Sequence, residues 1–188
     1  MNKNNLAITV GLTTFVSLLA SPFALSADQG AFSIGDFKGE VEVDLEITHD
    51  DNIFRTKLAE ESDLIVGLLP TIRLVNENAK RTLSFEYGAE SATYRDSDDD
   101  DYVSQHFDFE GVSNFGEENK LSFLAGYEIG NEERGTGSSE GAINVGLGVV
   151  DGPTEFDDLT AGLLYEYGGD NTRSDFEVGI DYSDLEFK

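Results

Sequence analysis

The residues best able to do chemistry in this sequence are carboxylates, and their densest run is residues 96–101. Within that run, Asp98, Asp99, Asp100 and Asp101 could ligate Ca²⁺ through carboxylate oxygens, which this hard cation prefers. The run lacks the glycine at the sixth position and the later glutamate of an EF-hand loop. A solvated, charged loop tip is therefore the favoured interpretation.

A shorter acidic segment, Asp50-Asp51-Asn52, offers the same types of ligand. Its side chains can equally accept hydrogen bonds from backbone N–H groups two residues on, which forms an Asx turn. The turn is the preferred interpretation. Neither acidic segment therefore predicts a metal site, and no cofactor is expected.

The two histidines, His49 and His106, are the imidazoles available as general bases. His106 shares its predicted strand face with Ser104 and Asp108, which supplies the residue types of a hydrolytic triad. Neighbours on one strand face lie about 6.5–7 Å apart, too far for direct hydrogen bonds without help from another strand. The sequence also has no cysteine and thus no thiol nucleophile. We do not expect an enzyme, and an acid-lined channel explains these residues better.

The charge balance limits the partners of the protein. The 188 residues include 38 Asp and Glu against 12 Lys and Arg, a formal net charge of -26. Such a surface repels phosphate backbones, so nucleic acid is excluded as a partner. Hydrophobic residues make up 39% of the chain and aromatic residues 11%, more than a disordered acidic segment carries. The chain should therefore fold.

Residues 1–27 have the pattern of a secretory signal peptide. Lys3 lies in a short basic segment, an apolar run follows over residues 6–25, and small residues lead up to Ala27. A retained transmembrane anchor is the alternative, because the run approaches the length of a membrane span. The small residues and the acids after them favour cleavage. We expect a periplasmic lead-in over residues 28–38 and outer-membrane strands over residues 39–188 of a Gram-negative protein.

Eight segments of the remaining chain alternate apolar with polar residues, which is the period of a β-strand. Helix is expected only in the signal peptide. The predicted class is all-β, an antiparallel up-and-down transmembrane β-barrel of about eight strands. The expected strands are residues 40–48, 63–75, 82–94, 102–112, 120–130, 141–150, 158–168 and 175–182.

The two faces of these strands predict their surroundings. One face is apolar, as expected for contact with lipid, and the other is acidic or glycine-rich, as expected for a curved lumen wall. A soluble sandwich is the alternative, although its outer face would usually carry Lys and Thr along with Glu. No carboxylate is expected on the apolar face, and Arg73 is expected among the acids as a basic partner. The predicted lumen-facing acids are Glu42, Asp44, Glu46, Glu86, Glu90, Asp108, Glu128, Glu166, Glu177 and Asp181.

The connections predict the orientation of the strands in the membrane. With a periplasmic N-terminus, the connections at 49–62, 95–101, 131–140 and 169–174 should be extracellular. Those at 76–81, 113–119 and 151–157 should be periplasmic turns. Pro70 is the one awkward residue, because an interior strand accommodates proline only at a bulge or an edge.

Several short motifs resemble a known family. They are His49-Asp50-Asp51-Asn52-Ile53-Phe54-Arg55-Thr56, then Leu69-Pro70-Thr71-Ile72, Phe85-Glu86-Tyr87, Asp101-Tyr102 and Glu133-Arg134-Gly135-Thr136. Over roughly residues 38–140 the ordered series resembles the outer-membrane β-barrel porin 2 family, which includes proteins encoded beside exopolysaccharide and capsule synthesis genes. The residues taken as the family-like motif are Asp50, Asp51, Asn52, Ile53, Phe54 and Arg55, and the resemblance rests on the ordered series rather than on any one motif. Members of the family are larger barrels, so the resemblance implies that this chain is an N-terminal half of such a barrel or a shortened relative.

Two functions follow from these observations. The first is an outer-membrane barrel that forms, or forms part of, a passive channel, linked by the resemblance to exopolysaccharide export. Its partners would be outer-membrane lipid and either polysaccharide or cationic small solutes, and a homo-oligomer is left open. The alternative is a soluble periplasmic or surface β-sheet module that binds a partner through its acidic loops, with Ca²⁺ as an option.

Overall fold

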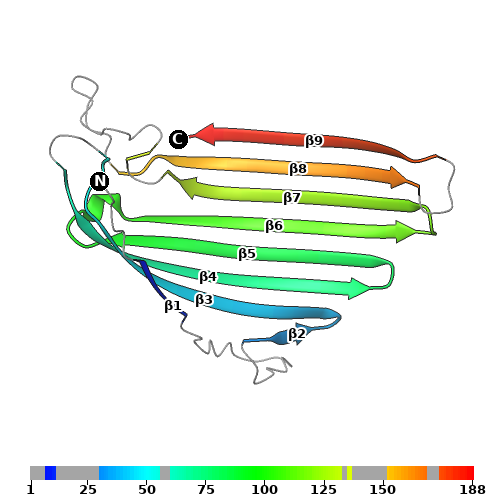
Figure 1. The fold of residues 1–188 in the computed structure, drawn as a ribbon, viewed down its shortest axis with the longest axis horizontal. Coiled ribbons are helices and arrows are strands. Elements are labelled where there is room, and N and C mark those ends of the chain that lie inside the picture. The colour runs from blue at the N-terminus through cyan, green and yellow to red at the C-terminus, as the bar shows by residue number, and fades with distance from the viewer. Residues whose placement is uncertain (1–6, 12–29, 56–59, 133–134, 137–151, 169–173) are drawn as a thin grey trace.

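The computed structural model describes residues 7–11, 30–55, 60–132, 135–136, 152–168 and 174–188, and it shows a single sheet of long strands (Figure 1). The all-β prediction is confirmed. In the described part of the chain, no helix is both long enough and apolar enough to cross a bilayer. The elements are β1 (Ala7–Gly11), β2 (Phe32–Ile34), β3 (Phe37–Asp50), β4 (Asp63–Asn78), β5 (Arg81–Tyr94), the 3₁₀ turn η1 (Asp98–Asp100), β6 (Tyr102–Phe115), β7 (Asn119–Asn131), β8 (Glu155–Tyr167) and β9 (Phe176–Phe187).

The strands follow one another across the sheet in the order β1-β3-β4-β5-β6-β7-β8-β9, and β2 pairs with β3. Every pairing is antiparallel, so the predicted up-and-down arrangement is also confirmed. The sheet is open: among the described residues, β9 pairs only with β8 (Figure 1). Long connections follow β3, β5 and β7 at one end, hereafter the loop end. Short connections follow β4 and β6 at the other, the turn end.

The two strands that flank the expected strand at residues 141–150 are direct neighbours in the sheet. Those residues fall outside the described part of the chain, but β7 pairs directly with β8 from Asn119↔Tyr167 to Asn131↔Glu155. The predicted orientation is therefore wrong beyond β7. Residues 152–157 lie at the loop end rather than among the turns, and β8 ends and β9 begins at the turn end.

The leader segment differs from the expectation as well. Helix was expected in residues 1–27, but β1 is a strand that pairs antiparallel with β3, from Ala7↔Thr48 to Gly11↔Asp44. The edge of β3 offers unpaired backbone groups over this stretch, and an extended segment satisfies them as a helix could not.

Apolar residues predominate on one face of the sheet and acidic residues on the other, but several carboxylates depart from this separation. Glu155, Asp157, Asp184 and Glu186 lie on the apolar face, because they pair across from Asn131, Ile129, Leu159 and Asp157 respectively. The expectation that no carboxylate lies on that face is therefore wrong. All four belong to the loop ends of β8 and β9, beyond Leu159 and Tyr182, which are the last apolar residues that these strands place on that face.

Pro70 sits inside β4, where it pairs with Val43 of β3. On its other side the β4–β5 pairing runs to Leu68↔Ser91 and resumes at Thr71↔Gly88. The gap falls where the missing proline N–H cannot contribute to the ladder. An interior strand thus accommodates the proline by a local interruption rather than at the sheet edge.

Four glycines lie directly opposite an aromatic side chain whose ring covers them. The pairs are Gly39↔Phe32, Gly88↔His106, Gly111↔Phe123 and Gly130↔Phe156. A methyl group at any of these glycines would come within 2.1–2.3 Å of the ring. All four glycines are buried. Their role is to admit a ring from the neighbouring strand, a known device for stabilising glycine in sheets. A need for space on a concave wall therefore does not explain these four glycines.

Replacing Gly111 with alanine tests this packing. The new methyl group would force the Phe123 ring off the strand, and we expect the free energy of unfolding to fall by about 1–2 kcal/mol, measured as a lower urea midpoint by circular dichroism. In a Phe123→Ala background the same substitution should cost much less, because the ring is absent. An equal cost in both backgrounds would contradict the assigned packing, and Ser113→Ala is the control.

Candidate functional site

The ladder brings all ten predicted lumen acids onto one face of the sheet. Residues paired across neighbouring strands share a face, as do residues two apart on one strand. Glu86 is opposite Asp108, Glu166 is opposite Glu177, and Asp181 is opposite Gly162. Repeating this step from β3 to β9 joins Glu42, Asp44, Glu46, Glu86, Glu90, Asp108, Glu128, Glu166, Glu177 and Asp181. We call this side the acidic face; that it lines a lumen remains a prediction.

Glu86 is the centre of the best-connected charge group on the acidic face. Arg73 lies directly opposite, and its Nη2 is 2.6 Å from Glu86 Oε2, with Nε also donating at 2.7 Å. His106 Nε2 lies 3.7 Å from Glu86 Oε1, so it strengthens the group only when it is protonated. The predicted role of Arg73 as a partner of the acids agrees with this contact. Such a solvent-exposed pair contributes at most about 1 kcal/mol to stability, so its main effect is on local charge.

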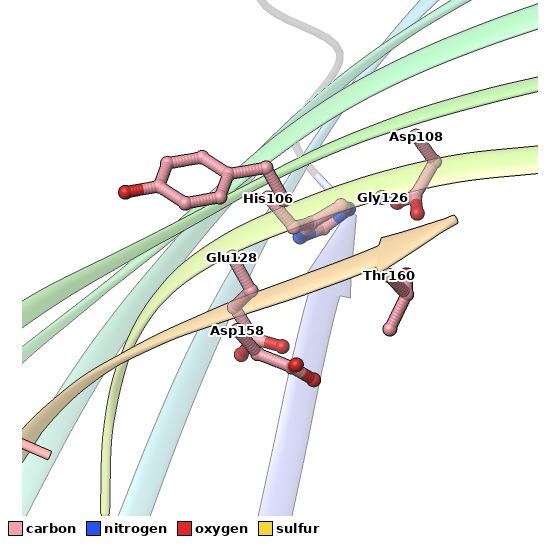
Figure 2. Close-up of a pocket in the computed structure, with 7 residues that line it drawn as sticks. His106, Asp108, Gly126, Glu128, Asp158 and Thr160 are labelled. Atoms are coloured by element: carbon pink, nitrogen blue, oxygen red, sulfur yellow. The ribbon is translucent and has the colours of Figure 1, made fainter. Parts of the chain in front are cut away.

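A shallow hollow of about 190 Å³ lies beside this group (Figure 2). Its walls come from β6, β7 and β8, where His106 pairs with Glu128 and Glu128 pairs with Asp158. Thr160 and Asp108 complete the polar lining across Gly126. The carboxylates of Glu128 and Asp158 lie on directly opposed positions and therefore repel each other. A cation in the hollow would reduce this repulsion.

The hollow is not a preformed metal centre. Within the described ranges, no group of three or more His, Cys, Asp or Glu side chains is arranged to hold an ion. The calcium candidates Asp98, Asp99, Asp100 and Asp101 are among these described residues and are not arranged as such a group either. Instead, Asp98–Asp100 form η1, Asp100 is 2% exposed, and Asp101 Oδ1 accepts a hydrogen bond from Tyr94 N–H at 2.7 Å. The expected solvated loop tip is thus correct for Asp98 and Asp99 and wrong for Asp100.

A second charged group lies at the turn end of the acidic face. Lys120 Nζ is 2.7 Å from Glu166 Oε2, and Glu177 lies opposite Glu166 on β9. The positive charge of Lys120 therefore offsets the negative charge of one of these two neighbouring carboxylates. This pairing was not anticipated, although the ladder partner of Lys120 follows directly once β7 and β8 are known to be neighbours.

The family-like motif after β3 folds back over the loop end of the sheet. Asn52 N–H donates to Asp50 Oδ1 at 2.8 Å, which confirms the predicted Asx turn. Arg55 N–H donates to Asn52 O at 2.9 Å, and Arg55 has a left-handed φ of 50°. This turn directs Ile53, 2% exposed, onto the sheet.

Ile53 is part of the only buried apolar cluster among the described residues. It packs with Ala92 and Tyr94, and the partly buried Phe54, Ile65 and Tyr102 surround them. Ile65 pairs with Tyr94, and Ala92 pairs with Tyr102, so the sheet contributes residues from the acidic face. We call this group the loop cluster. Sequence reasoning missed it, although the apolar Ala92 and Tyr94 on an otherwise acidic face were a usable signal.

Asp63 anchors the loop cluster to the neighbouring connection. It is 2% exposed, and its carboxylate accepts hydrogen bonds from the backbone N–H groups of Leu64 at 2.6 Å and of Arg95 and Asp96 at 3.2 Å. A buried carboxylate is tolerated because several donors replace its water.

The last of the family-like motifs, which contains Gly135, meets the first at the same place. Gly135 is buried with a left-handed φ of 78°, and a methyl group there would lie 2.6 Å from Ile53 O. A methyl group at Gly152 would likewise lie 3.0 Å from Asp99 O. Three connections far apart in sequence therefore converge at the loop end.

Substituting Asp63 tests the anchor. Alanine would remove the carboxylate that accepts hydrogen bonds from the backbone N–H groups of Leu64, Arg95 and Asp96, and we expect a loss of about 1–3 kcal/mol in unfolding free energy. Hydrogen exchange followed by mass spectrometry should show faster exchange at Arg95 and Asp96, while Asp98→Ala on the exposed part of η1 should leave it unchanged. Unaltered exchange in Asp63→Ala would show that the carboxylate does not hold the connection.

Comparison with known proteins adds one finding. The family described as "Putative beta-barrel porin 2" matches residues 28–177, which extends beyond the segment whose motifs resembled it. No curated protein and no solved structure matches the chain. The matched region contains all the strands from β2 to β8 and the start of β9. The chain therefore belongs to the beta-barrel porin 2 family.

Proposed function

We propose that this protein is an outer-membrane β-barrel protein that forms, or forms part of, a passive water-filled channel. The observation that supports this most strongly is the exposure of its large apolar side chains. Leu68 is 44% exposed, Leu163 46% and Ile180 69%, and they come from strands across the whole sheet. A soluble protein rarely exposes a continuous apolar face of this extent, whereas lipid would cover it in a membrane.

The alternative of a soluble sandwich requires a second layer to cover the apolar face. Domains in water bury the apolar side of a sheet against helices or another sheet. In the part of the chain that the structure describes, one sheet is present and its apolar face is uncovered. Family membership favours the barrel for the same reason.

Export would proceed through the signal peptide predicted for residues 1–27, and the lengths of the connections then orient the sheet in the membrane. Short connections follow β4 and β6 at the turn end, and longer ones follow β3, β5 and β7 at the loop end. Outer-membrane barrels have short periplasmic turns and longer extracellular loops. We therefore place the turn end in the periplasm and the loop cluster at the cell surface.

The acidic face would line the channel and favour cations. Carboxylates outnumber bases there, and a wall of one charge sign concentrates ions of the opposite sign. Transport would be diffusion, without a chemical step. The permeant would be a small cationic solute or a polysaccharide, the latter suggested only by the resemblance to proteins encoded beside exopolysaccharide genes.

Membrane insertion can be tested by electrophoresis. Detergent-extracted protein should migrate faster before boiling than after it, because a closed barrel stays compact in cold SDS. It should also sediment with outer-membrane vesicles. Protein that remains soluble without detergent and shows a single mobility would contradict the barrel and favour the soluble binding module.

Ion selectivity can be tested in planar bilayers. Reversal potentials in a salt gradient should show a preference for cations, and Glu128→Gln with Asp158→Asn should lower the cation-to-anion permeability ratio, because both charges lie on the acidic face. Asp98→Asn, an exposed acid in the connection before β6, is the matched control and should change the ratio less. Anion preference in the unsubstituted protein would refute the assigned wall.

A further inference from the structure

The acidic face carries an apolar group at the loop end of β8 and β9. It consists of Phe156, Leu185 and Phe187, and we call it the aromatic patch. Phe156 pairs with Phe187, and Leu185 pairs with Asp158, so the patch adjoins the carboxylates of the hollow. We infer that the aromatic patch and these carboxylates form a binding site for a small quaternary ammonium cation. The chemistry of the site belongs to the sheet itself, whereas its location inside a channel rests on the proposed function.

The patch arises because the sequence of β9 exchanges the character of its two faces. Ile180 and Tyr182 lie on the apolar face, but Leu185 and Phe187 lie on the acidic face. The register between β8 and β9 runs unbroken along both strands, so no bulge or slip produces this exchange. Lipid contact, which explains the apolar side chains of the opposite face, therefore does not explain Leu185 and Phe187.

The two β9 members of the patch are open to solvent. Leu185 is 55% exposed and Phe187 is 53% exposed. Elsewhere at the loop end, apolar side chains of the acidic face are covered, because Ile53 packs on Ala92 and Tyr94. An apolar group left open on a face rich in carboxylates marks an interaction site. Its ligand needs an apolar part and, among these acids, a positive charge.

The ring of Phe156 is held flat against the sheet. A methyl group built on Gly130 would lie closest to Phe156 Cζ and at 2.6 Å from both Cε atoms, so it would meet the face of the ring. One face therefore lies on Gly130, and the other is turned away from the sheet on the side of the acids. The ring of Phe187 stands beside it, with centroids 6.0 Å apart and planes at 56°. Tilted rings of this kind make two walls of an aromatic cage, the arrangement that recognises quaternary ammonium groups.

The carboxylates next to the rings belong to Asp158 and Glu128 (Figure 2). They occupy directly opposed positions on β8 and β7, and Asp158 is two residues from Phe156 on the same strand face. Such neighbours are about 6.5–7 Å apart, so a cation between them is within reach of both a ring and a carboxylate. Glu86 is paired with an arginine and Glu166 with a lysine. In the part of the chain that the structure describes, neither Asp158 nor Glu128 has such a base beside it.

The composition of the site selects the type of cation. Ca²⁺ requires about six to eight oxygen ligands, and across the described ranges no cluster of three or more His, Cys, Asp or Glu side chains could hold it. A primary ammonium group is strongly hydrated and has three N–H groups, for which the rings offer no oxygen acceptor. A quaternary ammonium group carries its charge on methyl groups and has no N–H to donate. It therefore gains from apolar contact and from the negative faces of the rings together.

Choline binding to the full protein in a nonionic detergent tests the site, with titration calorimetry as the measurement. Choline should bind several-fold more tightly than 3,3-dimethyl-1-butanol, which has the same shape without the charge. It should also bind several-fold more tightly than ethanolamine, which has a charge but no methyl groups. Both differences are expected because the site combines rings with carboxylates.

Substitutions in the site assign the binding to these residues. Phe187→Leu removes the ring and keeps an apolar side chain, so it should weaken choline binding roughly tenfold, whereas Phe187→Tyr should retain it. Asp158→Asn should weaken binding as well. Phe176→Leu, at the other end of β9 on the apolar face, and Glu177→Gln, at the turn end of the acidic face, are the matched controls and should leave the affinity unchanged. Variants are compared only when their circular dichroism matches that of the unsubstituted protein.

The possible results separate the site from the proposed function. Choline that binds no more tightly than the neutral alcohol, or equally well to Phe187→Leu, refutes the site, as does a complete lack of binding because another segment covers the patch. A cation-selective current in the same preparation then leaves the proposed function standing. Ring-dependent choline binding by protein that stays soluble and gives no current supports the site and refutes the channel.

Discussion

The arrangement of this protein depends on one constraint, the continuous antiparallel ladder from β3 to β9. In hydrocarbon a backbone N–H or C=O has no water to bond, so each must pair within the protein. The ladder supplies these bonds, and in doing so it fixes which side chains share a face. A slip of one residue would exchange the two faces of a strand. The position of the ten carboxylates on one face is therefore a consequence of backbone pairing.

The loop end shows how the same sheet supports a different kind of packing. There the acidic face carries Ala92 and Tyr94, and the connection after β3 covers them with Ile53. Asp63 ties the next connection to this cluster through three backbone donors. These contacts bury apolar residues in the usual way of soluble proteins, whereas the rest of the sheet leaves its apolar side chains exposed. The part of the chain with a conventional core is thus the part we place outside the membrane.

Much of the fold could be predicted from the sequence because strand periodicity is a local property. Val41, Val43, Leu45 and Ile47 alternate with acids, and that pattern alone defines both faces of β3. Pairing is not local, and residues 141–150 illustrate the limit: they alternate as well as any strand, yet β7 pairs directly with β8. The burial of Asp63 and Asp100 could not be foreseen for the same reason, since their surroundings come from distant segments. The glycines opposite rings needed knowledge of the register between two strands before their role was visible.

The order of the strands also has a consequence for how such a wall could be completed. β3 and β9 both run from the turn end to the loop end, because an even number of reversals separates them. Bringing their outer edges together would join two strands of the same direction. To close the sheet through antiparallel pairs alone, an odd number of further strands would have to lie between β3 and β9. Each of these two strands would then have a neighbour that runs in the opposite direction. β1 runs against β3 and so illustrates the direction that either edge requires. Because β1 lies in the predicted signal peptide, another segment or partner would have to supply such a strand after cleavage. Any segment or partner that closes the sheet must therefore supply an odd number of strands between β3 and β9.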